Sequence, residues 1–152
     1  ESTTTWNVAL GIQAAVDNGA NVLNLSLGGT GDSSVLDSVI QQAIAAGIPV
    51  FAAAGNQPVG TPTYPAADNG VIAVTATQGG QIAPYANYGS FVDLAFPGGV
   101  VIYLGGTAYI EQGTSVSTAT ATGVAVGNKG VLGWNWQQIE AAMQKKFTVP
   151  PK

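Results

Sequence analysis

The sequence predicts an α/β fold in which a parallel sheet is flanked by helices. Three short apolar runs, at 21–27, 48–54 and 70–77, have the composition of buried strands. Two segments with apolar residues at helical spacing lie before the first run and between the first two runs. Helix, strand, helix, strand in this order is typical of an α/β domain with parallel strands. A length of 152 residues without an internal repeat or a linker favours one domain.

The first helix is expected in "TTWNVALGIQAAVDNGA", residues 4–20. Its apolar face would consist of Trp6, Ala9, Leu10, Ile12 and Val16, and Gly19 would end it. The second helix is expected in "DSSVLDSVIQQAIAAG", residues 32–47, where Asp32, Ser33 or Ser34 can cap the start and Gly47 stands past the end. Its apolar side is formed by Val35, Leu36, Ile40, Ala43 and Ile44.

The strand runs differ in their patterns. Runs 48–54 and 70–77 are almost continuous in apolar or small residues, as in strands that are covered on both faces. In run 21–27, Asn24 interrupts the apolar sequence, and a buried Asn would need hydrogen-bond partners.

The second half of the chain is expected to hold turns, short strands and two helices. Residues 78–112 are rich in Gly, Tyr and Pro and favour turns with short antiparallel strands. A helix rich in Thr and Ala follows residue 113. In the last helix, Asn135 and Gln138 can form a capping box, and Pro150 with Pro151 cannot continue it. The apolar side of that helix is formed by Ile139, Ala142, Met143 and Phe147.

The composition excludes several classes of function. Only 8% of residues are charged, against about 25% in an ordinary soluble domain. Either uncharged polar side chains solvate the surface, or part of it faces another polypeptide. The net charge is −4, with four lysines and no arginine, so neither nucleic acid nor an anionic membrane surface is an expected partner. No run approaches the length of a membrane span.

The residue types also limit the chemistry. The chain has no Cys and no His, which leaves no disulfide, no thiolate or imidazole metal site and no cysteine nucleophile. The carboxylates do not cluster along the sequence, and Asp17, Asp37 and Glu140 are expected to be solvated helix residues. The chain opens with Glu1 and no leader pattern, so we expect a processed product or an excised piece.

Three local patterns leave alternatives open. The loop "SLGGTGDSS" (26–34) stands where phosphate-binding loops stand, but it lacks the lysine and the glycine spacing and reads as a turn. Asn56, after the small residues of "AAAGN", could donate to an oxyanion or be a turn residue. Ser115, in "EQGTSVSTATATG" (111–123), could be a nucleophile or a helix cap.

Taken together, five segments are similar to one known family. They are "NVLNLSLGG", "GIPVFAAAGN", "YPAADNGVIAVTAT", "YANYGSFVDLAFPG" and "GTSVSTATATG", in this order and at these separations. From about Trp6 to Gly127 the chain resembles the C-terminal half of the catalytic domain of subtilisin-like serine proteases, the subtilases. The resemblance implies a three-layer subtilisin-like fold in which residues 1–152 form the C-terminal portion of the peptidase domain.

The resemblance also implies roles for individual residues. Ser115 matches the nucleophile, Asn56 the side-chain oxyanion donor, and the Tyr64–Pro65 bond one that is cis in the family. Substrate-binding residues are matched by Ser26, Leu27 and Gly28, which would pair with an extended peptide, and by Ala53, Ala54 and Gly55, which would form one wall of the pocket before the scissile bond. The small residues of this wall suggest a roomy pocket with a broad preference for large apolar side chains.

Two departures from the family pattern limit the resemblance. The family's Asp-Thr-Gly and His-Gly-Thr-His motifs, which carry the catalytic aspartate and histidine, are absent. Without a histidine, this chain by itself has no general base for Ser115 and is expected to be inactive alone. After the serine, the family's Met-Ala-x-Pro-His is replaced by residues 116–120, Val-Ser-Thr-Ala-Thr.

Two functions are compatible with this pattern. The first is a serine endopeptidase whose histidine and aspartate lie on missing sequence, and the alternative is a catalytically inactive subtilisin-like binding or scaffold module. The expected partners are a polypeptide substrate and either an N-terminal half of the same domain or a second copy, bound through the bare edge of strand 21–27. No cofactor is expected, calcium is undecided, and the resemblance implies a secreted or extracytoplasmic location.

Overall fold

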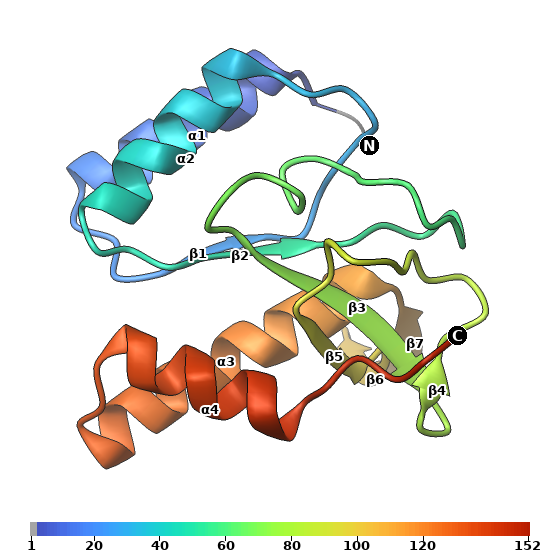
Figure 1. Cartoon of the computed structure of the whole chain (residues 1–152). Helices are drawn as coiled ribbons and strands as arrows, with labels where there is room; N and C mark the ends of the chain where they lie inside the picture. Colours follow the sequence, from blue (N-terminus) through green and yellow to red (C-terminus); the bar gives the residue numbers. More distant parts are fainter. Residues whose placement is uncertain (1–2) are drawn as a thin grey trace.

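Two layers of helices enclose a mostly parallel sheet in the computed structural model, which describes residues 3–152 (Figure 1). The sheet is formed by β1 (Leu23–Leu25), β2 (Val50–Ala53), β3 (Ile72–Gln78), β4 (Gln81–Ile82) and β5 (Leu94–Pro97). One face is covered by α1 (Thr5–Asp17) and α2 (Ser34–Ala45), and the other by α3 (Thr114–Leu132) and α4 (Trp136–Lys146) (Figure 1). The expected three-layer α/β fold is therefore confirmed.

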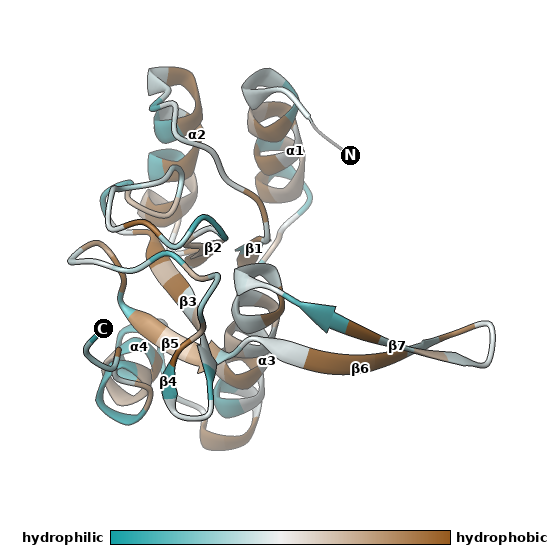
Figure 2. Cartoon of the chain, turned by 90° about the vertical axis from the view of Figure 1, so that its right-hand side faces the viewer, coloured by the Kyte–Doolittle hydropathy of each residue, from teal (hydrophilic) through white to brown (hydrophobic). Residues whose placement is uncertain are grey.

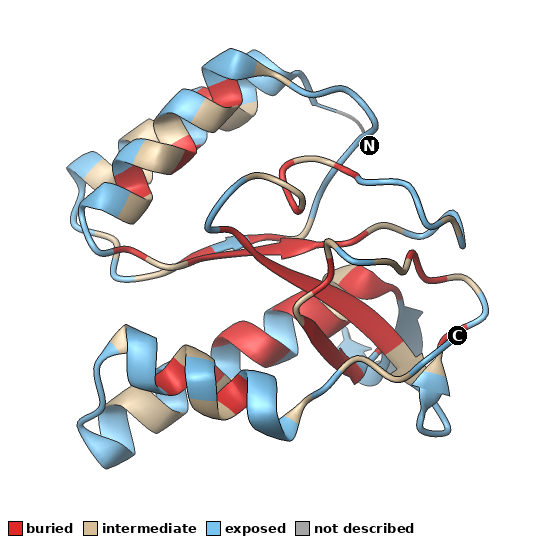
Figure 3. Cartoon of the chain, in the orientation of Figure 1, coloured by how far each residue is buried: buried red, intermediate tan, exposed pale blue. Residues whose placement is uncertain are grey.

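Strand pairing follows the expected order at the centre of the sheet. β2 lies between β1 and β3, and both pairs are parallel. β2 is buried along its whole length, as its continuous apolar run predicts, and Figure 3 shows the buried residues concentrated in the central strands.

The edge strand β1 differs from its prediction in two ways. It covers Leu23–Leu25 and not the whole run 21–27, and Asn24 is exposed, not buried. Within the described residues β1 pairs only with β2, so its other edge is open. The Asn24 side chain is nevertheless bonded, because its Oδ1 accepts from Thr122 Oγ1 at 3.1 Å and its Nδ2 donates to Ser26 Oγ at 2.9 Å.

The segment 78–112 was predicted to form antiparallel strands, and this is wrong for β5. β4 pairs antiparallel with β3, but β5 runs parallel to β3. Residues 83–93 return the chain to the starting end of β3, where Asp93 Oδ2 accepts the Ala73 N–H at 2.8 Å and aligns the two strands. The direction of β5 therefore depends on a tertiary contact.

An antiparallel hairpin extends beyond the layers. It consists of β6 (Gly99–Leu104) and β7 (Thr107–Gln112), and every residue of both strands is exposed. Figure 2 shows it extending away from the layers, next to the start of α3, with hydrophobic residues along much of β6 and part of β7. Tyr103 and Ile110 are about three quarters exposed.

Helix α1 buries less of its predicted apolar face than expected. Thr4 caps it, its Oγ1 accepting the Asn7 N–H at 3.2 Å, and Ala9 and Ile12 are buried. Trp6 is 61% exposed and Leu10 is 52% exposed. The packed side of α1 is narrow because it meets only α2 and the sheet.

Helix α2 begins and ends where the sequence predicts. Ser33 is the cap, its Oγ accepting the Leu36 N–H at 3.4 Å, and Gly47 follows the end with φ 79°. Leu36, Ile40 and Ala43 are buried, but Val35, predicted on the apolar side, is exposed.

The capping box predicted for the last helix, α4, is confirmed. Asn135 Oδ1 accepts the Gln138 N–H at 2.9 Å, and Gln138 Oε1 accepts the Asn135 N–H at 3.0 Å. Beyond the helix, the Phe147 ring stacks on Phe96 with the centroids 4.1 Å apart. Among residues 3–152, no helix combines the length and the apolar character that crossing a bilayer requires.

Candidate functional site

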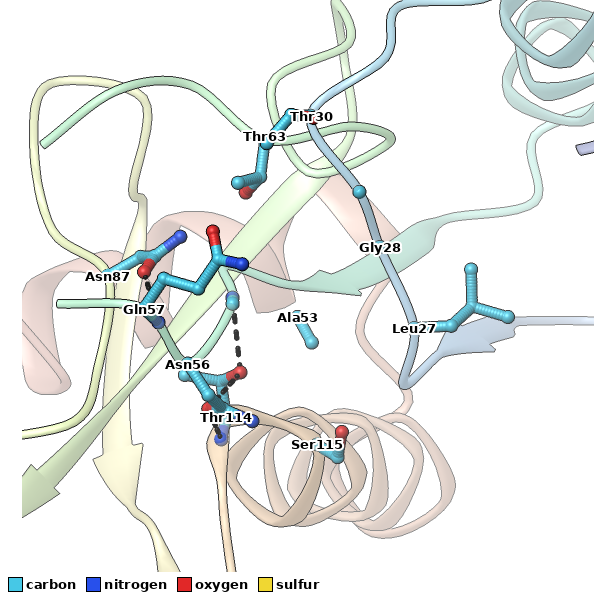
Figure 4. A pocket seen from close by; sticks show the side chains of 12 residues that line it. Leu27, Gly28, Thr30, Ala53, Asn56, Gln57, Thr63, Asn87, Thr114 and Ser115 are labelled. Atoms are coloured by element: carbon cyan, nitrogen blue, oxygen red, sulfur yellow. Dashed lines mark hydrogen bonds between the residues drawn. The ribbon is translucent and has the colours of Figure 1, made fainter. Parts of the chain in front are cut away.

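The carboxyl ends of β1 and β2 and the start of α3 surround one pocket, with a volume of 440 Å³ (Figure 4). Parallel strands place their carboxyl ends at one edge of a sheet, where ligands bind in α/β proteins. The pocket is lined by Leu27, Gly28, Gly29, Thr30, Ala53, Gly55, Asn56, Gln57, Thr63, Asn87, Thr114 and Ser115. Ser115 and Asn56, which are 59 positions apart in the sequence, thus meet at one site.

The Asn56 amide is held in one orientation. Its Oδ1 accepts the Thr114 backbone N–H at 2.9 Å and the Thr114 hydroxyl at 3.0 Å. The same hydroxyl accepts the Gly55 N–H at 3.1 Å, so its own proton is free to point at Asn56. Because both contacts require the oxygen, the Asn56 Nδ2 is left as a free hydrogen-bond donor.

Ser115 is not a helix cap. The cap position of α3 is Gly113, with φ 155° and no side-chain bond, and Ser115 is the second residue of the helix. Its Oγ instead donates to the Ser26 carbonyl at 3.1 Å, and Ser26 Oγ donates to the Ser115 carbonyl at 3.0 Å. A carbonyl oxygen cannot take up the Ser115 proton, so the hydroxyl has no base within the described chain.

Glycine is required at position 113 for two reasons. Its φ of 155° lies where side chains are strained, and a Cβ there would stand 3.3 Å from Asn56 Nδ2. The glycine therefore lets the helix start beside the free amide donor.

The peptide-binding residues expected from the resemblance are only partly gathered. Leu27, Gly28, Ala53 and Gly55 line the pocket, and Ser26 borders the adjoining groove with Leu27 and Gly28. Ala54 does not line the pocket, because its side chain is fully buried and its carbonyl accepts the Thr63 hydroxyl at 2.6 Å. The predicted cis peptide bond at Tyr64–Pro65 is present.

Several lining residues carried no sequence signal. Gln57 and Thr63 come from the connection between β2 and β3, Asn87 comes from the connection between β4 and β5, and only the fold brings these segments together. Asn87 is fully buried, and its Oδ1 accepts the backbone N–H groups of Gln57 at 2.8 Å and Val59 at 3.5 Å. Asn87 stands between Ala86 and Tyr88 in an ordinary loop composition, so its role is not predictable locally.

Asp68 interacts electrostatically with two carboxylates from a distant part of the sequence. Asp68 stands near Asp37 and Asp32, and its pKa is raised to about 6, first by burial and then by these two charges. The charges of Asp37 and Asp32 act on Asp68 because the loop before β3 folds onto α2, where Gln41 Nε2 bonds both Asp37 Oδ1 and the Asn69 carbonyl. This interaction has no signature in the sequence spacing, and no group of three or more acidic side chains within 3–152 is arranged to hold a metal ion.

Glu140 is likewise not a fully solvated helix residue. It is partly buried, and burial, followed by the nearby charge of Asp93, raises the pKa of its carboxyl. Of the three carboxylates expected to be solvated, Asp17 is exposed and Asp37 is half-buried.

Known proteins of one family are similar to this chain. The model of the subtilase family matches residues 1–149. Thermitase from Thermoactinomyces vulgaris is 40% identical over 144 residues, which cover 92% of this chain and 51% of thermitase. A thermostable alkaline protease from Halalkalibacterium halodurans is 39% identical over 122 residues, covering 78% of this chain and 34% of that protein.

Solved structures show the same relationship. A cold-adapted subtilisin-like serine proteinase superposes with a TM-score of 0.84 at 31% identity, covering 95% of this chain and 55% of that one. A prenylagaramide maturation protease superposes with a TM-score of 0.83 at 26% identity, and the match covers 93% of this chain and 57% of that protein. The chain therefore spans about a third to a half of the curated relatives it matches.

Proposed function

The chain belongs to the subtilase family, and from this premise we propose that it is the nucleophile-bearing half of a serine endopeptidase site. Ser115 is the nucleophile and Asn56 is the oxyanion donor. The histidine and the aspartate come from sequence outside these 152 residues.

The meeting of Ser115 and Asn56 at one pocket is the observation that carries this proposal. The Asn56 amide oxygen is bonded to Thr114, so its Nδ2 remains available to a ligand. Ser115 stands in the first turn of α3, where backbone N–H groups have no partner inside the helix and the helix dipole favours negative charge.

The reaction follows from these positions. Ser115 Oγ attacks the peptide carbonyl, its proton passes to the histidine of the complementary half, and the negative oxygen accepts from Asn56 Nδ2 and the Ser115 N–H. A donor of this kind stabilises the transition state by about 3–4 kcal/mol. The protonated histidine then gives its proton to the leaving amine, and water hydrolyses the acyl-enzyme. No cofactor takes part in this sequence.

The substrate is a polypeptide bound in extended form beside residues 26–28. Among residues 3–152, no hydrogen bond engages the backbone of Leu27 or Gly28, so their N–H and C=O groups can pair with a peptide. The Ser26 carbonyl now accepts the Ser115 hydroxyl, which has to turn from it toward the histidine before attack.

The same premise supports a protein partner. The open edge of β1, the exposed side of α1 with Trp6 and Leu10, and the apolar β6–β7 hairpin form surfaces that the described chain does not cover. We propose that an N-terminal half carrying the aspartate and the histidine covers them, and that isolated chains otherwise self-associate through residues 21–27. An extracytoplasmic location goes with this proposal.

Reconstitution tests the function. The chain is mixed with a separately produced N-terminal half of thermitase, complex formation is followed by size-exclusion chromatography, and hydrolysis of a fluorogenic peptide is measured. We expect hydrolysis only from the complex, none with Ser115→Ala, and a rate about 10²–10³-fold lower with Asn56→Ala.

Two outcomes would contradict the enzyme proposal. Hydrolysis that persists with Ser115→Ala would mean that the nucleophile is elsewhere. A stable complex that binds peptides but never cleaves them would instead support the inactive binding or scaffold module.

A further inference from the structure

The floor of the pocket contains a buried donor without a partner. Asn87 is fully buried, and within residues 3–152 its Nδ2 is the one buried side-chain nitrogen or oxygen that makes no hydrogen bond. Buried polar groups are almost always paired, so an unpaired donor beside a ligand pocket indicates that a ligand group supplies the partner.

The orientation of this amide is determined by its neighbours. Asn87 Oδ1 accepts the Gln57 N–H at 2.8 Å and the Val59 N–H at 3.5 Å. A rotated amide would direct its NH₂ group at these two N–H groups. The free atom at position 87 is therefore a donor and not an acceptor.

The donor reaches the pocket beside Gly55. A Cβ at Gly55 would lie only 2.5 Å from Asn87 Nδ2, so the missing side chain lets the amide approach the pocket wall. Figure 4 shows the amides of Asn87 and Gln57 and the hydroxyl of Thr63 grouped at one end of the pocket, away from Ser115.

The other polar groups at this end are uncharged and can accept a hydrogen bond. Thr63 Oγ1 uses its proton on the Ala54 carbonyl and keeps a lone pair free. The exposed Gln57 side chain makes no hydrogen bond within the described residues and can turn its Oε1 toward a ligand. No charged residue lines the pocket.

We propose that this pocket selects a carboxamide side chain, that of glutamine, on the substrate residue whose carbonyl Ser115 attacks. The carboxamide oxygen accepts from Asn87 Nδ2, and its NH₂ group donates to Thr63 Oγ1 and Gln57 Oε1. This inference rests on the proposed function, and it replaces the preference for large apolar side chains that the small residues at 53–55 suggested.

The polar groups of the pocket favour a glutamine side chain over the similarly sized leucine and glutamate side chains. A leucine side chain would leave Asn87 Nδ2 unpaired, and sites built to bond a polar group reject analogues that lack it. A glutamate carboxylate would lose hydration in a pocket that no charged residue lines, so nothing there would balance its charge. A pocket of 440 Å³ has room for a glutamine side chain.

Peptide binding to the isolated chain tests the inference without requiring hydrolysis. Acetylated tetrapeptides that differ only in a C-terminal Gln, Glu or Leu are titrated into the ¹⁵N-labelled chain, and NMR shifts are followed. We expect the Gln peptide to bind about tenfold more tightly than the Leu and Glu peptides. It alone should shift the Asn87 side-chain NH₂ signals.

The matched variant is Asn87→Asp, which keeps an oxygen for the Gln57 and Val59 N–H groups and removes the donor. We expect it to abolish the advantage of the Gln peptide over the Leu peptide. If this variant does not fold, the relative affinities of the three peptides for the unaltered chain test the inference. The Asn87 side-chain signals are then assigned through their proximity to Gly55.

The possible failures are distinguishable. If Leu or Glu peptides bind as tightly as the Gln peptide while the signals of Gly28, Asn56 and Ser115 shift, the pocket preference is overturned and the proposed function stands. If none of the peptides shifts these three signals, the proposed function fails together with the inference.

Discussion

Thr114 connects the two residues of the candidate site. It is fully buried; its hydroxyl accepts the Gly55 N–H and donates to Asn56 Oδ1, and its backbone N–H donates to the same oxygen. One threonine therefore orients the Asn56 amide and satisfies a part-buried backbone donor. In the motif Gly-Thr-Ser, the threonine is a positioning residue for the asparagine.

The Thr114→Val substitution tests this connection. It leaves the Gly55 N–H unpaired and removes one of two bonds to Asn56, so we expect a loss of about 1–3 kcal/mol in the free energy of unfolding. Urea denaturation followed by circular dichroism measures it. The matched control is Thr120→Val on the exposed side of α3, expected to change stability by less than about 0.5 kcal/mol; equal losses in both would contradict the role of Thr114.

Ser115 should be unreactive in the isolated chain. Its hydroxyl donates to the Ser26 carbonyl and has no base in contact, so its oxygen is no more nucleophilic than that of an ordinary serine. Mass spectrometry of fluorophosphonate-treated chain should find labelling at Ser115 no faster than at the exposed Ser38. Rapid stoichiometric labelling that Ser115→Ala removes would reveal a base that the described chain does not contain.

Asp68 gives stability a dependence on pH. Its pKa is about 6 in the folded chain against 3.8 when unperturbed, so between these values the folded state holds a proton that the unfolded state has lost. The contribution of Asp68 to the free energy of unfolding therefore falls as pH rises from about 4 to about 6. Burial is partial, so solvent screening limits the effect to roughly 1 kcal/mol.

The Asp68→Asn substitution should follow this dependence. It should stabilise the chain by roughly 1 kcal/mol at pH 7 and change little at pH 4, as measured by urea midpoints at the two pH values. Asp17→Asn on exposed α1 is the control and should alter neither midpoint appreciably. A gain that is larger at pH 4 than at pH 7 would reverse the sign and refute the argument.

At the scale of elements, α3 is the helix that the site depends on. It contacts β1, β2, β3 and β5, and its packed side consists of small residues: Thr114, Ser117, Thr118, Ala121, Thr122 and Ala125. The buried hydroxyls of Thr118 and Thr122 lie within hydrogen-bond distance of carbonyls one turn earlier in the helix, and the Thr122 hydroxyl also contacts Asn24 Oδ1 beside β1. The small side chains let α3 lie close to the sheet and bring Ser115 to the strand ends.

The Ala121→Leu substitution tests the close packing of α3. Ala121 is fully buried, and three added carbons must displace the sheet or the helix, so we expect a loss of about 1–3 kcal/mol or more. Thermal unfolding of Ala121→Leu and of the control Ala119→Leu, on the exposed side, gives the comparison. Equal stability of the two variants would mean that α3 has room to move.

At the scale of the whole molecule, the low fraction of charged residues is consistent with surfaces that another polypeptide covers. Leu23 donates its N–H to Pro49 across β1 and β2, so alternation directs the Asn24 N–H to the open edge of β1. A row of unpaired backbone groups at such an edge invites pairing with another chain.

The Asn24→Pro substitution removes the outward N–H and leaves the β1–β2 bonds in place. We expect light scattering to find self-association of the unaltered chain and a monomer for the variant, with circular dichroism as the check on folding. Leu10→Lys, on the exposed side of α1, is the control for a general loss of apolar surface. A strictly monomeric unaltered chain without any bound fragment would count against the proposed edge pairing.

Local patterns predicted the elements well because their causes are local. The Ser33 cap, the glycine after α2 and the capping box of Asn135 and Gln138 all act within one helical turn. The predictions of which apolar side chains are buried failed where burial depends on contact with another segment. Trp6 and Leu10 have apolar side chains at helical spacing, yet nothing in residues 3–152 covers them.

The sequence by itself determined the α/β order, the helix boundaries and, through motifs in register, the family with its candidate nucleophile and oxyanion donor. Only the tertiary structure decided that β5 runs parallel, that the charges of Asp37 and Asp32 act on Asp68, and that Asn87 lines the pocket. The physical reason is that periodicity and capping depend on neighbours within a few residues. A shared charge environment or an unpaired buried donor depends on segments that folding alone brings together.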